Sequence, residues 1–135
     1  MTNQIFILHT DGGSRGNPGL AASAAVLYDQ NYNIIDQVGE YIGQTTNNQA
    51  EYKGLLFGLQ LAKKNKVSDL IICMDSELIV KQMLGEYKIK DVGLKELAEQ
   101  VKSQLKNFTS YKFKHVRREK NKEADALVNK VLDNL

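Results

Sequence analysis

The feature that most constrains the fold is an apolar run that ends abruptly in a carboxylate. Residues 4–10 read Gln-Ile-Phe-Ile-Leu-His-Thr, and Asp11, Gly12 and Gly13 follow at once. A short apolar run bounded by a turn signal predicts a buried strand, here Gln4–Thr10. Asp11 is then expected at the C-terminal tip of that strand, where open α/β sheets place their ligands.

Turn signals and periodicity divide the rest of the chain into further candidate elements. A glycine-rich loop is predicted over residues 11–19, which end in Asn-Pro-Gly. Leu20–Tyr28 is rich in alanine and could form a helix by composition, but its position between two turn signals favours a strand. The other predicted strands are 33–42, 69–74 and 108–115; the predicted helices are 46–64, a short one that follows Ser76 and ends at Leu84, 94–106 and 121–135.

The order of these elements, β-β-β-α-β-α-α-β-α, predicts an α/β fold with a mixed five-stranded sheet. The first three strands, joined by short turns, should be antiparallel, with the third near the sheet edge. The fourth and fifth strands follow helices and should run parallel to the first through right-handed crossovers, which places helices on both faces. We expect residues 1–135 to form one domain.

The helix predicted over 46–64 carries two glycines one turn apart. Each of Gly54 and Gly58 costs about 1 kcal/mol relative to alanine in a helix interior. The pair therefore indicates close approach to the sheet, over the alanine-rich strand. Thr46 and Gln49 have the spacing of a capping box at the start of this helix.

Composition excludes several classes of protein. The single cysteine, Cys73, lies in an apolar run, so we expect a buried, unreactive thiol and a reducing, cytoplasmic setting. No targeting signal and no run of membrane-spanning length is visible, so no membrane role is expected. The formal net charge of +2 is too small to predict a nucleic-acid partner.

Basic residues are nevertheless concentrated near the C-terminus. Six of them stand against the single acid Glu119: Lys112, Lys114, Arg117, Arg118, Lys120 and Lys122. Such a segment could face phosphate groups. It could equally be a solvated surface, and the charge pattern alone favours that interpretation.

Four carboxylates fall where burial is expected. Asp11 and Asp75 each end an apolar strand, Glu51 continues the apolar stripe of its helix, and Asp125 lies between two alanines at the edge of another stripe. Buried carboxylates are costly without partners, and the chain has only three arginines. Ion pairing throughout the interior is therefore not expected.

A bound cation would remove this cost. Oxygen ligands select Mg²⁺ or Mn²⁺ over Zn²⁺, and two such ions about 4 Å apart can stabilise an in-line phosphoryl displacement. Each carboxylate also has an ordinary alternative: Asp11 as a turn residue, Asp75 as a helix N-cap, and Glu51 beside a helix dipole. If the carboxylates do cluster, at least one should have a raised pKa without metal.

The segment Gly12-Gly13-Ser14-Arg15-Gly16 could be taken for a phosphate-binding loop. It matches neither the dinucleotide fingerprint nor a P-loop, and it leads into a predicted strand instead of a helix. No nucleotide cofactor is expected.

Four motifs together resemble ribonuclease H type 1, in the right order and across essentially the whole chain. They are Asp11-Gly12-Gly13-Ser14…Asn17-Pro18-Gly19, Thr46-Asn47-Asn48-Gln49-Ala50-Glu51, Asp75-Ser76 and Asn121-Lys122-Glu123-Ala124-Asp125-Ala126-Leu127. The resemblance implies the ribonuclease H fold and Mg²⁺-dependent endonucleolytic cleavage of the RNA strand of an RNA–DNA hybrid. The products would carry 5′-phosphate and 3′-hydroxyl ends, Mn²⁺ would be the substitute metal, and we expect a monomer.

The same resemblance assigns roles to individual residues. It implies that Asp11 bridges two metal ions, that Glu51 and Asp75 complete the site nearer the leaving group, and that Asp125 completes the site that activates water. The residues implied to contact the hybrid are Ser14, Asn17, Asn47 and Asn48, together with the backbone of Gly12 and, at a DNA phosphate, Thr46. Selectivity for RNA would come from groups that read its 2′-hydroxyl.

Two departures from the family pattern matter. Many bacterial members carry a basic, aromatic protrusion after the second helix, but residues 85–93 are too few for it and lack tryptophan, so substrate affinity is expected from 112–122. Many members also have a mobile histidine in a glycine-containing loop. His115 stands ten residues before Asp125, but without that glycine, and Arg118 could contact the phosphate instead. His9 is expected in the core or on a sheet face.

Three other functions fit the sequence less well. A non-catalytic binding module on the same fold would not need all four carboxylates. A 3′→5′ exonuclease of the same superfamily would have Asp-x-Glu on the first strand, where this chain has Gly13. An integrase or transposase would need larger flanking domains than 135 residues can hold.

Overall fold

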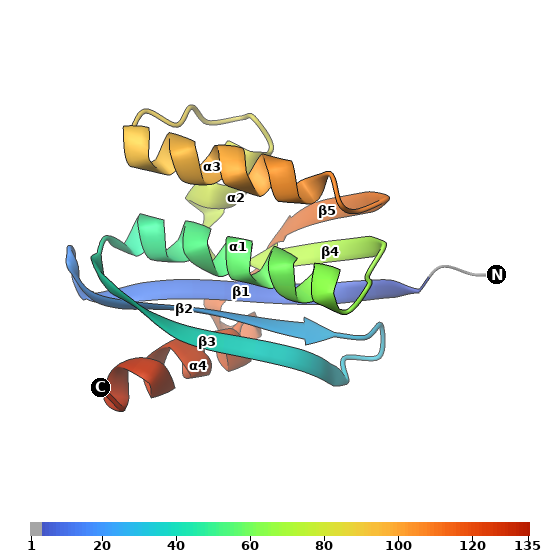
Figure 1. Ribbon diagram of the computed structural model, residues 1–135, viewed down its shortest axis with the longest axis horizontal. Coiled ribbons are helices and arrows are strands. Elements are labelled where there is room, and N and C mark those ends of the chain that lie inside the picture. Colours follow the sequence, from blue (N-terminus) through green and yellow to red (C-terminus); the bar gives the residue numbers. More distant parts are fainter. Residues whose placement is uncertain (1–3) are drawn as a thin grey trace.

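The computed structural model describes residues 4–135 and contains five strands and four helices (Figure 1). The strands are β1 Ile5–Gly16, β2 Gly19–Tyr28, β3 Ile34–Thr45, β4 Asp69–Met74 and β5 Ser110–His115. The helices are α1 Asn47–Lys64, α2 Glu77–Met83, α3 Val92–Leu105 and α4 Lys122–Asp133, with a 3₁₀ turn at Arg118–Lys120. The alanine-rich segment is thus a strand, as its flanking turn signals predicted.

The five strands form one mixed sheet in the order β3-β2-β1-β4-β5. β2 is antiparallel to both β1 and β3, while β4 is parallel to β1 and β5 is parallel to β4. The predicted fold class is confirmed, including the edge position of β3. Within residues 4–135, no helix has the length and apolar character to cross a membrane.

Helices cover both faces of this sheet (Figure 1). α1 packs on one face, with α3 against it, and α4 packs on the other. The larger apolar core lies between the sheet and α1, α2 and α3, and includes Leu8, Leu59 and Ile72. Smaller clusters lie under α4 and include Val26, Cys73 and Val128. Cys73 is buried, as expected, and burial raises the pKa of its thiol.

The predicted loop over residues 11–19 is wrong, because β1 continues through most of it. β1 stays paired with β2 from Ile7↔Tyr28 to Gly16↔Gly19. Its pairing with β4, in contrast, ends at Thr10↔Met74. Gly12 and Gly13 predicted a turn, but their backbone stays extended because it is paired with Ser23 and Ala22 of β2. Asp11 therefore lies in mid-strand, at the first position of β1 beyond the end of β4.

The glycines of α1 allow its backbone to lie directly on β1. A Cβ on Gly54 would overlap the carbonyl oxygen of Asp11, and one on Gly58 would lie 2.8 Å from the side chains of Leu8 and Thr10. Gly12 makes the same approach from the strand, since its Cβ would overlap the Ala50 carbonyl. Close approach is confirmed, and α1 lies over the alanine-rich strand β2 as well as over β1: a Cβ on Gly54 would lie 3.4 Å from the Ala24 carbonyl oxygen, and the Ser23 hydroxyl donates to the Ala50 carbonyl at 2.6 Å.

The capping box predicted at the start of α1 is only half formed. The Gln49 N–H donates to the Thr46 hydroxyl at 3.2 Å, which confirms Thr46 as the N-cap. The return bond of a capping box is missing, because the Gln49 side-chain oxygen accepts from the Thr45 hydroxyl instead. α3 begins two residues earlier than predicted because Asp91 caps it, accepting from the Leu94 N–H at 2.9 Å.

Candidate metal centre

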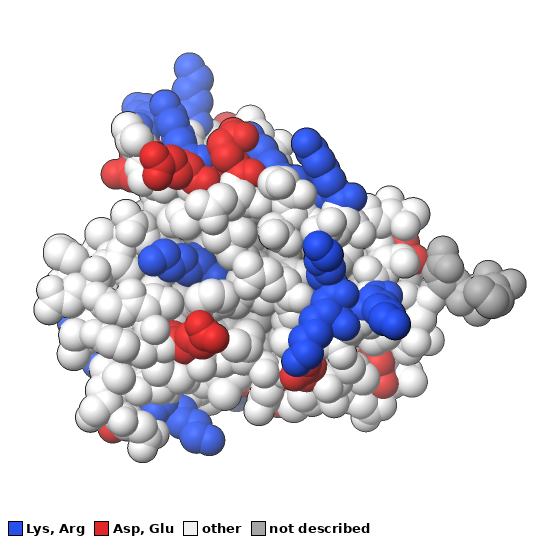
Figure 2. All heavy atoms as spheres, viewed as in Figure 1, with Lys and Arg blue, Asp and Glu red and all other residues white. Residues whose placement is uncertain are grey.

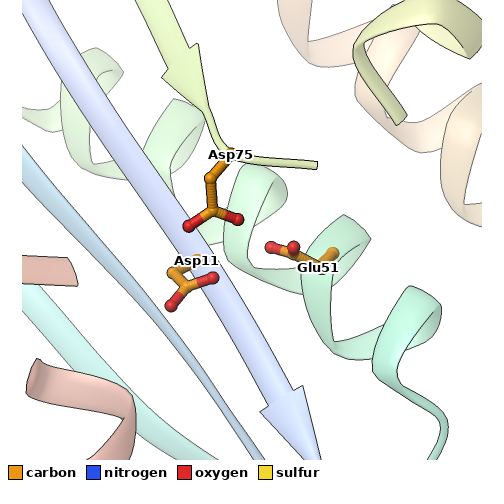
Figure 3. A group of neighbouring side chains, drawn as sticks. All are labelled: Asp11, Glu51 and Asp75. Carbon is orange, nitrogen blue, oxygen red and sulfur yellow. The ribbon is translucent and has the colours of Figure 1, made fainter. Parts of the chain in front are cut away.

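Three carboxylates from separate elements converge at one edge of the sheet. Asp11 comes from β1, Asp75 follows the last residue of β4, and Glu51 comes from α1. One oxygen from each of the three lies within 4.8 Å of the others, and Figure 3 shows the side chains pointing toward one another. The group forms where β4 ends beside a continuing β1, and where the Gly12–Ala50 contact brings α1 against the same point.

The ordinary explanations for Glu51 and Asp75 do not fit this geometry. Glu51 is the fifth residue of α1, and the first turn of that helix holds no acid, so the helix dipole does not account for it. Ser76, not Asp75, caps α2, with its hydroxyl accepting from the Ile79 N–H at 3.3 Å. Within residues 4–135, Glu51 Oε1 is buried without any hydrogen-bond partner.

The electrostatics of the group are unfavourable in the absence of a cation. Burial, followed by the charge of Asp75, raises the pKa of Asp11 to about 7, although the Gly12 N–H acts in the opposite direction. Burial and the charges of Asp11 and Asp75 raise the pKa of Glu51 well above its usual value. In the part of the chain that the structure describes, no lysine, arginine or histidine forms an ion pair with these three groups. The expected rise in pKa is confirmed.

The fourth predicted carboxylate, Asp125, reaches the same cavity from α4. It lies outside the group of oxygens within 4.8 Å of one another, but close enough for its charge to contribute to the raised pKa of Asp11. Its own neighbour is Asn129, whose amide lies 3.5 Å from Asp125 Oδ2. Three of the four carboxylates therefore form a compact group, and the fourth lines the same cavity and interacts with Asp11.

A polar cavity of about 380 Å³ surrounds the four carboxylates. It is lined also by Gly12, Ser14, Asn47, Asn48 and Arg118, which were predicted to contact substrate, and by Gly13, Arg15, Ser76, Val128, Asn129 and Leu132, which were not assigned to the site. Asn129 could have been found, because it lies one helical turn after Asp125. Arg15 forms an ion pair with Asp133 of α4 at 2.5 Å.

The predicted substrate residues of the β1–β2 turn and of α1 form one hydrogen-bonded group. The Ser14 N–H donates to Asn47 Oδ1 at 2.8 Å, and the Asn47 N–H donates to Asn17 Oδ1 at 3.0 Å. Asn17 thus supports the cavity wall without lining it. Thr46 does not line the cavity either, because its hydroxyl caps α1.

The two predicted auxiliary residues differ in position. Arg118 lines the cavity. His115 ends β5 beside Met74 and does not line it; its Nδ1 lies 3.9 Å from a carboxylate oxygen of Glu77.

His9 is buried on a sheet face, as expected, and its ring lies 3.0 Å from the side-chain oxygen of Asn121. Burial lowers the pKa of His9. Asn121 was part of the last sequence motif but had no assigned role, and its nearly complete burial was not foreseen.

The residues present fit a hard divalent cation. The donor set consists of carboxylate oxygens alone, which Mg²⁺ and Mn²⁺ prefer. No group among the described residues donates a hydrogen bond to the buried Oε1 of Glu51. A cation at this point would offset both the burial of the carboxylates and their mutual repulsion.

Comparison with known proteins identifies one matching family and several similar proteins. The family described as reverse transcriptase-like matches residues 9–131. The bifunctional protein Rv2228c of Mycobacterium tuberculosis is 38% identical over 94% of this chain, which spans 35% of that protein's length. RNase H1 of Halobacterium salinarum is 37% identical with a TM-score of 0.95, covering 97% of this chain and 99% of its own. LC11-RNase H1, solved in complex with an RNA/DNA hybrid, is 42% identical with a TM-score of 0.89, covering 96% and 97%.

Proposed function

The chain belongs to the ribonuclease H family, type 1, and from that membership we propose that it hydrolyses the RNA strand of RNA–DNA hybrids. The proposed reaction is endonucleolytic and depends on Mg²⁺, with Mn²⁺ as a substitute. It leaves a 5′-phosphate on one fragment and a 3′-hydroxyl on the other.

The observation that carries the proposal is the convergence of Asp11, Glu51 and Asp75, with which no lysine, arginine or histidine among residues 4–135 forms an ion pair. Three carboxylate oxygens lie within 4.8 Å of one another, and one buried oxygen of Glu51 has no partner among residues 4–135. Such an arrangement destabilises the metal-free fold. Binding of divalent metal by the three carboxylates during the reaction would explain this arrangement.

The resemblance to ribonuclease H type 1 assigns roles to the carboxylates. Asp11 belongs to the compact group with Glu51 and Asp75 and is also affected by the charge of Asp125, which supports the implied contact of Asp11 with two ions. Glu51 and Asp75 would hold the ion nearer the leaving group, and Asp125 would hold the ion nearer the attacking water. Two bound ions would supply charge stabilisation at the attacking and leaving oxygens.

The bond changes follow from the proposed products. A water oxygen forms the new bond to phosphorus, and the bond from phosphorus to the 3′ oxygen breaks. The 3′ oxygen takes up a proton to become the hydroxyl, and the attacking water loses a proton to solvent. Asp125, which is partly exposed and lines the cavity, would orient that water.

Substrate would be held by the residues that frame the cavity. Ser14, Asn47 and Asn48 line the cavity with polar groups, and Gly12 lines it beside them. Arg118 adds a positive charge for a phosphate. The hybrid bound to LC11-RNase H1, a relative of closely similar fold, supports this choice of substrate.

The test is cleavage of a labelled RNA–DNA hybrid with Mg²⁺, compared with the same reaction in excess chelator. Single-stranded RNA, double-stranded RNA and double-stranded DNA serve as alternative substrates. Asp11→Asn should lower kcat by at least about 10³-fold, a loss typical of removing a main electrostatic contributor. Asp69→Asn is the matched control, because Asp69 lies at the opposite end of β4 from Asp75; it should cleave like the wild type.

The products are identified by their ability to be ligated or labelled at each end. Cleavage that persists in chelator, or in Asp11→Asn, would contradict the proposal. Tight hybrid binding without any cleavage would instead identify a binding module.

A further inference from the structure

Asn121 occupies a helix-capping position but does not cap its helix. It immediately precedes α4, and its side chain makes no hydrogen bond to the N–H groups of the first turn. Asparagine at this position normally accepts such a bond. The side chain is instead turned inward and is only 1% exposed, so its amide is engaged elsewhere.

That amide contacts two parts of the proposed metal centre at once. Asn121 Nδ2 donates to the carbonyl oxygen of Thr10 at 2.9 Å and to Asp75 Oδ2 at 3.1 Å. An amide nitrogen has two hydrogens, and both are used. The Thr10 carbonyl belongs to the peptide that leads into Asp11, so a single side chain fixes the backbone at one carboxylate and the carboxylate group of another.

His9 supplies the donor that matches the direction in which this amide faces. Asn121 Oδ1 lies 3.0 Å from His9 Nδ1, and because a carbonyl oxygen can only accept, Nδ1 must donate. Nε2 of the neutral ring is then an acceptor, 3.5 Å from the Tyr32 hydroxyl. A reversed amide would set its oxygen against the Thr10 carbonyl and the Asp75 carboxylate, which is electrostatically unfavourable. His9 is held in turn by edge-on contacts with Tyr28 and Tyr32.

We propose that Asn121 is a positioning residue of the metal centre, and that His9 acts with it by locking the amide orientation. Outer partners of this kind orient ligating carboxylates and contribute to metal affinity. The inference rests on the proposed function, since it concerns the same carboxylates. Neither residue lines the cavity, so neither is assigned contact with substrate.

The chain offers a matched pair of variants at His9. His9→Asn retains an N–H donor close to the position of Nδ1, whereas His9→Phe fills similar space without a donor. Titration calorimetry with Mn²⁺ should show about tenfold weaker binding for His9→Phe and binding within about twofold of wild type for His9→Asn. Asn121→Asp, which replaces the donor facing Asp75 with an oxygen, should bind Mn²⁺ at least as weakly as His9→Phe.

Kinetics provide a second measurement. The KM for hybrid should not change in these variants, while the Mg²⁺ concentration for half-maximal activity should rise in parallel with the loss of Mn²⁺ affinity. Val101→Ala serves as the stability control, because Val101 is buried in α3 away from the cavity. It should lower thermal stability and leave Mn²⁺ affinity unchanged.

Wild-type Mn²⁺ affinity in His9→Phe and Asn121→Asp would overturn this inference and leave the proposed function intact. Equal losses in His9→Asn and His9→Phe, or a similar loss in Val101→Ala, would also overturn it. If His9→Phe does not fold, Asn121→Asp carries the test. A wild-type chain that binds no Mn²⁺ would overturn the proposed function, and this inference with it.

Discussion

The carboxyl group of Asp11 is protonated more readily in the metal-free fold than in the unfolded chain. Its pKa is about 7 when folded, against 3.8 ordinarily, chiefly because it is buried. Between these values the folded state binds more protons than the unfolded state, so the free energy of unfolding falls as pH rises. The loss is complete above pH 7.

We therefore predict that Asp11→Asn stabilises the metal-free protein at pH 8, by about 2–4 kcal/mol. At pH 4.5, where the folded wild type keeps the proton on this group, the gain should be much smaller. Urea unfolding in excess chelator at both pH values measures the difference. A gain of equal size at pH 4.5 and pH 8 would show that ionisation of the Asp11 carboxyl is not its cause.

The sequence predicted which carboxylates meet but not what orients them. Asp11, Glu51 and Asp75 could be found because each lies on or at the end of an apolar element, where a lone charge is conspicuous. The contact between His9 and Asn121 joins residues 112 positions apart. It depends on a side chain that leaves its usual capping role, and no local pattern indicates that choice.

At the scale of elements, the site depends on how closely α1 approaches β1. A Cβ on Gly54 would meet the backbone oxygen of Asp11, whereas one on Gly58 would meet side-chain atoms of Leu8 and Thr10. Side-chain atoms can move more cheaply than a strand backbone, and alanine is intrinsically better than glycine in a helix by about 1 kcal/mol.

We predict that Gly54→Ala lowers the free energy of unfolding by about 2–4 kcal/mol through overpacking and weakens Mn²⁺ binding, because Asp11 must shift. Gly58→Ala should cost about 0–2 kcal/mol and leave Mn²⁺ affinity close to wild type. Thermal or urea unfolding and Mn²⁺ titration of the two variants test this order. The reverse order would mean that α1 does not rest on the Asp11 backbone.

The close packing of α1 on β1 also explains why the first strand is longer than predicted. Gly12 and Gly13 predicted the start of a loop, because glycine usually marks a turn in sequence. Here position 12 requires glycine because a side chain would overlap the Ala50 backbone of α1. The backbone of Gly12 remains paired with Ser23 of β2. The turn signal at Asn17 and Pro18 was correct, since it lies between β1 and β2. Composition alone does not distinguish glycine used for flexibility from glycine used for space.

At the scale of the whole molecule, the open question is what provides affinity for a long, charged substrate. The connection between α2 and α3, residues 84–91, is short and leaves no room for a basic protrusion. All six basic residues between 112 and 122 are exposed, and Arg118 among them lines the cavity. A second group of basic side chains gathers over the C-terminal end of α1 (Figure 2), where Lys63 and Lys64 occupy the last turn.

Of these two groups of basic residues, only the one between residues 112 and 122 adjoins the proposed metal centre. Variants of the α1 group can therefore serve as controls for variants of the first group. Lys64 lies 13 residues beyond Glu51 along α1, or about 20 Å at the usual helical rise. We predict that Arg117→Gln combined with Lys120→Gln weakens hybrid binding several-fold and reduces the slope of log affinity against log salt by about 1–2, since each lost phosphate contact contributes about 0.9. Lys63→Gln combined with Lys64→Gln should change neither.

The measurement is fluorescence anisotropy of a labelled hybrid over a range of salt concentrations, in the Asp11→Asn background so that the substrate stays intact. In the active protein the Arg117/Lys120 pair should raise KM with little change in kcat, because neither residue lines the cavity. An equal effect from the α1 pair would mean that overall charge, not a defined surface, draws the hybrid in. An unchanged salt slope in both double variants would indicate that the phosphate contacts lie at the cavity instead, where Arg15 and Arg118 are the lining cations.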